Sequence, residues 1–581
     1  MDIELRISEL HIKGFRNFVD ETIVFDEKTL IIGGNDTGKS NMLYALRILF
    51  DPTLSARDFE LTSSDFNIQS DAEAIEITAK LEDIHEDYVN SALQEAVKDG
   101  TAYIRYTLQK GEDYEFSTGY DEDLLEACHG RPYIKNLVLE YVASNRDLTS
   151  FLKRQQNRLL ELARDQRDES QATEDDESIA GIQTSLLGLN DQINALHYVS
   201  DSLVAVNNEM RVLSIGNEGY TVKLVAGNTD AGKLLDNLQL AYLHGESPLV
   251  FGGDGRSNQL YFATWTSEQR LTKRPEKAIV FAIEEPEAHL HPHQQRALAE
   301  YLSATMEGQV LITTHSPQIV ERFANGSILR LTGPDSSGIN HAKGCSADVD
   351  EALAKMGYRL NAVSSEVFFS DGVLLVEGPS ERMFYTALSC ALDKDIDRLN
   401  VSILSVDGVG FEPYVRACKG LGIPYAVRTD NDIFGLGTDK NRRMAGVKRL
   451  IGLAKEFIDD AELEKLVAGK ESHLTWKESD EVPDEAKSAA LELTPAFEKY
   501  GLFLSRQPDL EHDLVHGPLL DRLKQFFGVG SAEEVVKVMQ QRKAENMHSF
   551  IASSPDLCSL KEDPIVAPLN YIVKQAESSR N

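Results

Sequence analysis

The chain has 581 residues and carries 94 acidic against 59 basic side chains, which gives a net charge of −35. This length exceeds what one hydrophobic core serves, so we expect two or three domains. No run approaches the roughly 18 apolar residues needed to cross a bilayer, and the opening residues lack the pattern of a secretion signal. The five cysteines form no CxxC pair, which excludes a zinc ribbon and a disulfide scaffold. We therefore expect a soluble cytoplasmic protein with no membrane partner.

The acidic balance bears on nucleic-acid binding, because phosphates are normally bound by Lys and Arg with release of counterions. Carboxylates that hold divalent metals also add negative charge, and they bind phosphate through the metal. A local basic patch can coexist with an acidic surface elsewhere. Composition alone leaves two alternatives open: an acidic protein without a nucleic-acid partner, and one that handles nucleic acid through metals.

The first segment, residues 1–144, alternates β-like runs such as AIEITAKL with helical stretches, which is typical of an α/β domain. The run TLIIG leads into GGNDTGKS at 33–40, and the helix-like NMLYALRILF follows. This matches the P-loop pattern in its strand–loop–helix context, where backbone N–H groups wrap phosphates, the lysine reaches the β- and γ-phosphates and the serine binds Mg²⁺. The predicted ATP-binding residues are Gly33, Asn35, Asp36, Thr37, Gly38, Lys39 and Ser40.

The second segment, residues 145–240, predicts an inserted helical hairpin. An acidic run at 165–178 lies at or near its tip. A heptad seam follows, with spacings of 3, 4, 3, 4 and 3. Its members are Ile179, Ile182, Leu186, Leu189, Ile193 and Leu196. A dimerisation arm and a hairpin that packs back on its own ATPase core both fit this seam.

The third segment, residues 241–360, returns to strand and helix alternation and completes the nucleotide site. AIVFAIEEPE ends a buried strand on acids. Glu284 is placed to complete the magnesium site beside Ser40, and Glu285 to orient the attacking water. QVLITTHSP then presents His315 after a third strand, where it can contact the γ-phosphate. A looser region from GPDSSG to Tyr358 follows.

The last segment, residues 361–581, begins a second α/β pattern with a parallel sheet and ends in helices. The strands VLLVEG, VSILSV and PYAVRTD each end on carboxylates, and the carboxyl ends of parallel strands share one edge of a sheet. Converging acids repel without a cation, so a metal site is predicted there. Its ligands are Glu377, Glu381, Asp407, Asp430 and Asp432. For Asp407 a turn role beside Gly408 is the alternative. From about 445 the chain is mainly helical, with one further strand at 502–505.

Two resemblances follow from these motifs. GFRNF near the start, the P-loop, EEPE and HSP, in that order, resemble the ABC ATPases of the repair and SMC-like branch. In that family a signature segment of one subunit closes on the nucleotide of the other, and residues 252–259 (GGDGRSNQ) are the candidate. This resemblance implies a homodimer with ATP between its heads. The order of EG, DG and DxD resembles the Toprim domain of topoisomerases, primases and certain nucleases.

The whole arrangement is similar to the overcoming lysogenisation defect (OLD) family of endonucleases, which includes the nuclease of the Gabija anti-phage system and nucleases attached to some retrons. The resemblance implies two-metal cleavage of DNA with Mg²⁺ or Mn²⁺, in a homodimer or higher homo-oligomer, with a helicase or a retron reverse transcriptase and RNA as potential partners. It also implies a later acid and a lysine. Glu511 is the matching acid, with Asp509 as the alternative, and Lys543 would stabilise charge on the scissile phosphate. A solvated helix face is the alternative for Lys543.

Two other functions compete with the nuclease. A Toprim topoisomerase needs a tyrosine nucleophile in a separate domain, which nothing marks here, and the cysteine spacing excludes the zinc module usual in primases. An SMC-like DNA tether needs coiled coils of hundreds of residues, whereas the insertion spans about a hundred.

Overall fold

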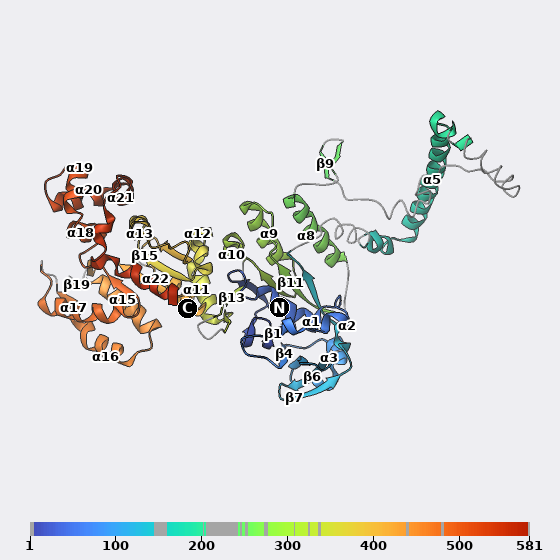
Figure 1. The fold of residues 1–581 in the computed structure, drawn as a ribbon, viewed down its shortest axis with the longest axis horizontal. Coiled ribbons are helices and arrows are strands. Elements are labelled where there is room, and N and C mark those ends of the chain that lie inside the picture. The colour runs from blue at the N-terminus through green and yellow to red at the C-terminus, as the bar shows by residue number, and fades with distance from the viewer. Residues whose placement is uncertain are drawn as a thin grey trace. The chain divides into compact units, whose positions relative to one another are not determined.

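The structure is a computed structural model of the chain (Figure 1). It describes residues 5–144, 158–204 except 159 and 202, 242–244, 247–249, 254–271, 277–306, 308–323, 326–334, 339–408, 410–436, 441–477 and 481–578. The chain divides into two compact units, which are described separately. The first comprises Met1–Ser144, Glu276–Glu287 and Pro292–Asn581, and the second comprises Asn145–Pro275 and Ala288–His291.

An antiparallel six-stranded sheet opens the first unit. Its strand order is β2-β1-β4-β5-β6-β7. The bounds are β1 Arg6–Phe15, β2 Phe18–Val24, β4 Ala74–Glu82, β5 Ala102–Gln109, β6 Glu115–Asp121 and β7 Leu124–Cys128. Buried and half-buried residues alternate strictly along most of β5, as expected for a sheet with one face in the core and one toward solvent.

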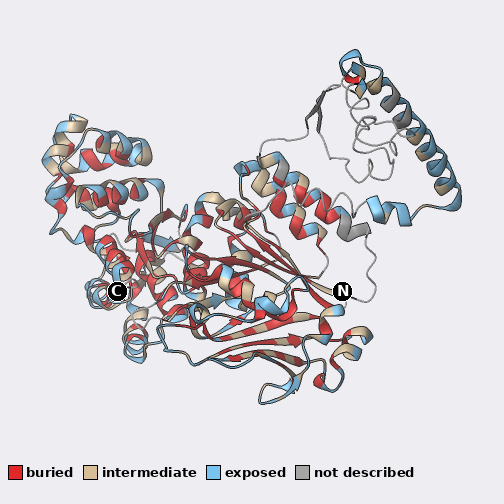
Figure 2. Cartoon of the chain, turned by 45° about the vertical axis from the view of Figure 1, so that its right-hand side comes forward, coloured by how far each residue is buried: buried red, intermediate tan, exposed pale blue. Residues whose placement is uncertain are grey.

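A second six-stranded sheet carries the P-loop, in the order β14-β13-β3-β12-β11-β8. All neighbours except the β13–β14 pair are parallel. The strands are β3 Lys28–Ile32, β8 Leu137–Val142, β11 Ala278–Glu284, β12 Gln309–Thr313, β13 Ser327–Thr332 and β14 His341–Gly344. Every residue of β12 is buried, as a strand covered on both faces requires. Figure 2 shows that buried residues run along the strands of the sheets. The accompanying helices are α1 Lys39–Phe50, α2 Ala56–Phe59, α3 Asp87–Leu93, α9 Pro292–Thr305 and α10 Pro317–Arg322.

A four-stranded parallel sheet follows, in the order β16-β15-β17-β21. Its strands are β15 Gly372–Val376, β16 Val401–Ser405, β17 Tyr425–Thr429 and β21 Leu502–Leu504. Helices α11 Ala347–Met356 and α12 Ala362–Ser365 precede it, and α13 Pro379–Ala391, α14 Glu412–Gly420 and α15 Ala445–Phe457 belong to it. Because all four strands run in one direction, their carboxyl ends share one edge.

The rest of the first unit is mainly helical. A small antiparallel sheet pairs β18 Ile433–Leu436, β19 Asn441–Met444 and β20 Thr475–Lys477. The helices are α16 Ala461–Lys470, α17 Asp484–Glu498, α18 Leu510–Val515, α19 Leu520–Phe527, α20 Ala532–Gln541, α21 Lys543–Ala552 and α22 Ala567–Ser578. The apolar faces of α18, α19, α20, α21 and α22 join β15 and α13 in one hydrophobic core, which fixes α18 and α21 against the parallel sheet.

In the second unit the structure describes α5 Glu169–Asn194, α8 Asp254–Leu271 and the β9–β10 pair, Tyr242–His244 and Ser247–Leu249. Residues 166–168 are non-helical, and α5 begins within the acidic run. Ile182, Leu189 and Leu196 of the predicted seam are exposed. Much of the predicted hairpin, including 145–157 and 205–240, lies outside the described residues, so dimerisation through it stays a prediction.

The predicted strands after residue 275 are present, as is the one at 502–505, and the helical C-terminus is present too. The expectation of a looser region up to Tyr358 was wrong. This region holds β14 and α11, whose buried Val349, Ala352 and Met356 follow a helical spacing and whose N-terminus is capped by the Ser346 side chain. Among the described residues no helix is long and apolar enough to cross a membrane.

Candidate functional site: a phosphate cradle and a carboxylate cluster

The loop between β3 and α1 has a backbone that requires its glycines. Gly38 has a φ of 103°, and a Cβ there would lie 2.2 Å from the Asn17 side-chain nitrogen. Gly33 has a φ of 153°, and a Cβ there would lie 2.4 Å from the Leu331 carbonyl oxygen. Only glycine fits these positions, so the loop can close into a turn of the P-loop type at the N-terminus of α1.

Lys39, the first residue of α1, points back over this loop. Its Nζ donates hydrogen bonds to the carbonyls of Gly33 and Gly34, at 3.0 and 2.7 Å, and the side chain is almost fully buried. Burial lowers the pKa of Lys39, while the nearby carboxylates Glu285 and Glu284 act in the opposite direction. Lys39 therefore places its ammonium group at the P-loop, as expected of a residue that binds β- and γ-phosphates.

Ser40 and Glu284 meet beside Lys39. The Ser40 hydroxyl donates to Oε1 of Glu284, and the Tyr141 hydroxyl donates to Oε2 of the same carboxylate at 2.6 Å. Burial, together with this hydrogen bond to Glu284, raises the pKa of Tyr141. Hydroxyl and carboxylate oxygens at this point form a donor set that suits Mg²⁺. Glu284 thus lies where the sequence places the magnesium-side acid.

Glu285 and His315 lie close to each other. His315 Nε2 lies 3.3 Å from Oε1 of Glu285. Burial, with the charge of Lys39, lowers the pKa of His315, which favours the neutral ring, while the carboxylate of Glu285 acts in the opposite direction. Glu287, which has no predicted role, accepts hydrogen bonds from the Thr314 hydroxyl and the His315 backbone N–H, both at 2.7 Å. Glu287 therefore ties the loop after β11 to the segment that carries His315.

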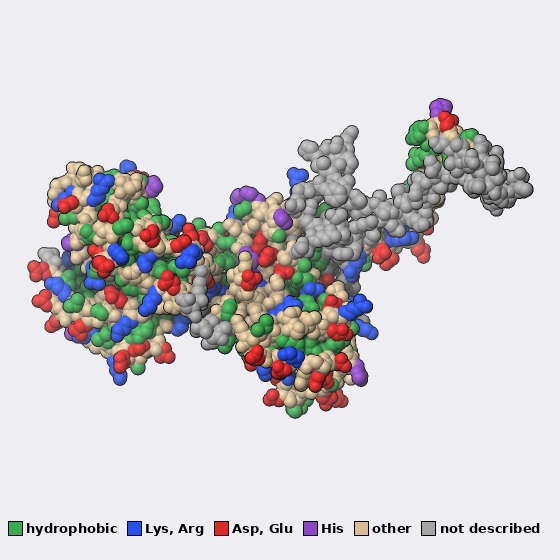
Figure 3. Space-filling view, in the orientation of Figure 1, with side chains coloured by type: hydrophobic (Ala, Val, Ile, Leu, Met, Phe, Trp, Pro, Cys, Tyr) green, Lys and Arg blue, Asp and Glu red, His purple; other side chains and the backbone are tan. Residues whose placement is uncertain are grey.

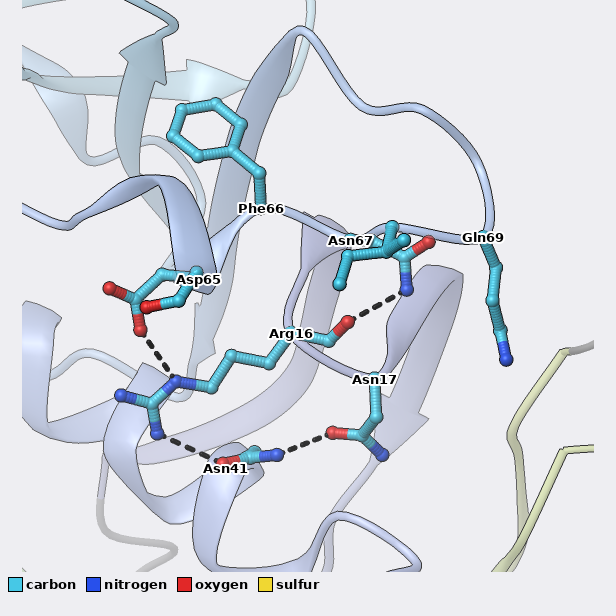
Figure 4. A pocket seen from close by; sticks show the side chains of 9 residues that line it. Arg16, Asn17, Asn41, Asp65, Phe66, Asn67 and Gln69 are labelled. Atoms are coloured by element: carbon cyan, nitrogen blue, oxygen red, sulfur yellow. Dashed lines mark hydrogen bonds and ion pairs between the residues drawn. The ribbon is translucent and has the colours of Figure 1, made fainter.

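A cavity of about 600 Å³ is lined mainly by polar side chains, among them Arg16, Asn17 and Asn41. Figure 4 shows how these side chains lie. Arg16 donates to Asp65 and to Asn41, both at 2.9 Å, and Asn41 donates to Asn17 at 2.6 Å. Asn17 also donates to the carbonyl of Thr37 at 3.1 Å, which joins the cavity to the phosphate cradle. GFRNF was recognised only as a family motif, and that its Arg16 and Asn17 line a cavity was not predicted.

Glu377 and Asp432 meet at the carboxyl edge of the four-stranded parallel sheet. Oε1 of Glu377 accepts hydrogen bonds from the Thr429 hydroxyl and from the Asp430 backbone N–H, the latter at 2.9 Å. Thr429 ends β17 and Glu377 follows β15. The carboxylate of Glu377 therefore joins the ends of these two neighbouring strands. Arg449 donates to both acids, with Nη2 2.8 Å from Oδ2 of Asp432. One guanidinium therefore joins two predicted metal ligands.

A buried arginine lies behind this edge. Arg428, the penultimate residue of β17, donates to Asp430 at 2.8 Å and to Asp513 at 3.3 Å, and Oε1 of Glu381 is 3.7 Å away. Burial raises the pKa values of Asp430 and Glu381, and Arg428 opposes that rise. A role for Arg428 was not predicted, although a charged residue inside a buried strand needs partners of opposite charge.

The two C-terminal candidates also reach the sheet. Lys543 begins α21, and its Nζ lies 3.0 Å from Oε2 of Glu511 and 3.6 Å from Oδ2 of Asp509. Glu511 is fully buried and accepts a hydrogen bond from Ser380 in the first turn of α13, at 3.3 Å. Lys543 is thus paired with buried acids, which disfavours the alternative of a solvated helix face.

Asp407 is the predicted ligand that is set apart. Its carboxylate accepts a hydrogen bond from the Ser405 hydroxyl at 2.8 Å, and its φ is 50°. The side chain is exposed, and the Gly408 N–H donates to the Glu377 carbonyl. This geometry favours the turn alternative, although the position stays at the same edge of the sheet.

The acids form a donor set suited to hard divalent cations, but they are already compensated by internal cations. In the described part of the chain, no three acidic, histidine or cysteine side chains converge closely enough to hold a metal. Arg449, Arg428 and Lys543 lie between the carboxylates instead. The carboxylate oxygens suit a divalent cation, and binding one requires the arginine and lysine side chains to leave them.

Charge is mixed across the face of the molecule shown in Figure 3, where acidic and basic side chains are interspersed. A net charge of −35 therefore coexists with local cations close to the carboxylate cluster. The predicted signature segment at 252–259 begins outside the described residues, and the described remainder lies at the start of α8.

Two family models match the chain. The TOPRIM-domain model of overcoming lysogenization defect protein-like proteins matches residues 368–432. A model of the AAA ATPase domain matches residues 5–199 and 253–320.

Among individual proteins, the chain is similar to Endonuclease GajA of Bacillus cereus, with 27% identity over 94% of this chain and 95% of that protein. It is 25% identical to the OLD nuclease of Thermus scotoductus, over 74% of this chain and 82% of that protein. A solved structure of the C-terminal region of the Burkholderia pseudomallei OLD protein is 23% identical, covers 36% of this chain and 99% of that chain, and has a TM-score of 0.27.

Proposed function

This chain belongs to the OLD family of nucleases, with an AAA ATPase domain and an OLD-like Toprim domain, and we propose that it is an ATP-regulated, divalent-metal-dependent DNA endonuclease. The family resemblance predicted from the sequence is confirmed. So is the α/β fold class, a P-loop ATPase head followed by a Toprim domain with a parallel sheet and C-terminal helices.

One observation carries the proposal. Carboxylates from three separate parts of the chain gather at one edge of the parallel sheet: Glu377 after β15, Asp430 and Asp432 after β17, and Glu511 in α18. Such a gathering is costly unless cations compensate it, and it lies where ligands bind in open parallel sheets. A purely structural cluster has no need to place its acids at strand ends.

The residues divide into three roles in this proposal. Glu377, Asp430 and Asp432 hold Mg²⁺ or Mn²⁺ at the sheet edge, with Glu381 and Glu511 completing the deeper part of the site. Divalent cations there supply Lewis-acid stabilisation of the charge that develops on a phosphodiester during in-line displacement. Lys543, fixed by Glu511 and Asp509, adds a positive charge next to the scissile phosphate.

ATP acts as the regulator at the other site. The P-loop residues, from Gly33 through Ser40, bind the phosphates, Glu284 completes the magnesium site, and Glu285 with His315 faces the γ-phosphate. The polar cavity lined by Arg16, Asn17 and Asn41 is large enough to take the nucleoside. ATP between two heads of a homodimer then repositions the Toprim domains.

The substrate of the proposed nuclease is DNA, which places the enzyme in the cytoplasm of a bacterial-type cell, and anti-phage defence is the role that the family suggests. A helicase or a retron reverse transcriptase with its RNA is the partner expected if the isolated protein is inactive.

The test is cleavage of supercoiled plasmid by the full-length protein with Mg²⁺ or Mn²⁺, with and without ATP. We expect the wild type to nick or linearise the plasmid, and Glu377→Ala and Asp430→Ala to abolish cleavage while binding of a fluorescent ATP analogue persists. Asp407→Ala separates the two alternatives for that residue, since retained cutting assigns it to the turn. Cutting by either of the first two variants would contradict the site assignment.

The same assay separates the competing functions. Relaxed closed circles indicate a topoisomerase-type reaction, and intact supercoiled DNA that is retained on the protein with ATP indicates a tether. The ATP lanes give the sign of the regulation, with Lys39→Ala as the variant that removes the phosphate contact.

A further inference from the structure

Arg449 lies between two proposed metal ligands, and it belongs to none of the motifs in the sequence. Its Nη2 is 2.8 Å from Oδ2 of Asp432, and its Nη1 contacts both Oε1 of Glu377 and the Thr429 hydroxyl. The exposed fractions of the Arg449, Glu377 and Asp432 side chains are 14, 15 and 30%. The contact is therefore partly shielded from solvent, and a guanidinium that bridges two carboxylates through its two Nη atoms differs from a loose surface pair.

The position of α15 fixes this contact. The Ala445 N–H donates to the carbonyl of Asp432 at 2.7 Å, so the helix begins at the strand end itself. Gly446 packs so closely that a Cβ there would lie 2.1 Å from the Asp430 carbonyl oxygen. Arg449 follows one turn later on the same side of the helix, which brings its guanidinium over the carboxylates.

Arg449 and a divalent cation need the same oxygens. Oε1 of Glu377 already accepts from Thr429, from the Asp430 N–H and from Arg449. A metal ion at Glu377 and Asp432 would meet the positive guanidinium at contact distance, and two cations at such a distance repel. Metal binding and the arginine contact are therefore mutually exclusive at these two acids.

Resting on the proposed metal-dependent nuclease, we propose that Arg449 is a displaceable internal cation that competes with the divalent metal for Glu377 and Asp432. Without metal it neutralises the two carboxylates and holds the site closed. With metal it leaves them, so that loading the site requires enough free metal to outcompete the arginine. Arg449 in this role is a positioning residue that sets the metal concentration at which the enzyme becomes active.

The test compares Arg449→Gln with Lys448→Gln by calorimetric titration with Mn²⁺ alone, on the full-length protein without DNA or ATP. Lys448 is the neighbouring residue on α15, is half-buried and forms no ion pair with a described residue, so both variants lose one positive charge from the same helix. We expect Arg449→Gln to bind Mn²⁺ about tenfold more tightly than the wild type, with Lys448→Gln close to the wild type.

A second readout is thermal unfolding. In EDTA, Arg449→Gln leaves Glu377 and Asp432 uncompensated, so it melts below Lys448→Gln, and Mn²⁺ raises its melting temperature by more than that of the wild type. Equal or weaker Mn²⁺ binding in Arg449→Gln than in Lys448→Gln would overturn the inference. A failure of the proposed function gives a different result. If Glu377 and Asp432 hold no metal, the double variant Glu377→Ala with Asp432→Ala, which keeps Arg449, binds Mn²⁺ as the wild type does.

Discussion

In the described part of the chain, Glu287, beside the phosphate cradle, has hydrogen-bond donors on only one of its two carboxylate oxygens. Glu287 accepts two hydrogen bonds on Oε1, whereas its buried Oε2 has no hydrogen-bond partner among the described residues. Burial raises the pKa of Glu287. An acid whose pKa is higher in the folded state than in the unfolded state contributes stability that is present at low pH and is lost as pH rises through the folded pKa.

Glu287→Gln should therefore stabilise the protein at neutral pH. The amide keeps the oxygen that accepts from Thr314 and His315, and it removes a buried charge. We expect the melting temperature of the variant, relative to the wild type, to rise from pH 5 to pH 8, measured in EDTA without nucleotide. A relative melting temperature that is flat or falls over this range would contradict the pKa assignment.

The matched control is Glu287→Ala, which removes the acceptor as well as the charge. It leaves the Thr314 hydroxyl and the His315 N–H unpaired, at a cost of about 1–3 kcal/mol for each buried group. Lower stability in Glu287→Ala than in Glu287→Gln at every pH separates the lost hydrogen bonds from the lost charge.

At the scale of elements, the sequence predicts what is local. The strands β3, β11, β15 and β17 are short apolar runs that end on glycines or acids, and each is where its pattern places it. Helix α11 was missed because its ten residues follow a glycine- and serine-rich run that favours a loop.

Pairing between strands is not local, and it was only partly predicted. The early β-runs were read as one α/β pattern, but β1, β4 and β5 form an antiparallel sheet apart from the P-loop strand β3. For the same reason the sequence predicted Glu377, Asp430 and Lys543 from motifs and family resemblance, yet not Arg449. Its position depends on how closely α15 approaches the end of β17, which no residue spacing encodes.

That approach can be tested with two glycines of α15. We expect Gly446→Ala to destabilise the protein and to reduce plasmid cleavage severalfold, because its Cβ would overlap the Asp430 carbonyl oxygen and force α15 away from the carboxylates. Gly452→Ala is the control, since nothing lies within 4 Å of a Cβ there and alanine favours a helix interior by about 1 kcal/mol. Melting curves and cleavage rates of the two variants give the comparison, and equal behaviour would show that the close approach is not required.

At the scale of the whole molecule, hydrogen bonds link the P-loop to the Toprim sheet. The Thr37 carbonyl accepts from Asn340 at 3.2 Å, and Asn340 also donates to the carbonyl of Thr332 in β13, at 3.1 Å. Two residues earlier in β13, the buried Arg330 donates to the Ser370 carbonyl at 2.8 Å and to Asp371 at 3.1 Å. These two residues directly precede β15, whose other end carries Glu377.

Arg330 and Asp371 therefore connect the strand beside the P-loop strand to the strand that presents Glu377. Burial lowers the pKa of Arg330, and its pairing with Asp371 opposes that effect. A buried arginine that loses a partner keeps its charge and its need for acceptors, so a shift that separates Arg330 from Asp371 would cost free energy. Removing the carboxylate while keeping its shape should weaken this link and leave both sites intact.

Asp371→Asn is the variant that tests this link, and Glu366→Gln is its control, an exposed acid five residues earlier. We expect Asp371→Asn to bind a fluorescent ATP analogue and to cleave plasmid without ATP within about twofold of the wild type, while the ratio of cleavage rates with and without ATP moves toward one. Coupling energies between sites are about 1–3 kcal/mol, so loss of part of that energy is measurable as a several-fold change in the ratio. Glu366→Gln should keep the wild-type ratio. If Asp371→Asn keeps it too, the signal from ATP does not pass through the contact between Arg330 and Asp371.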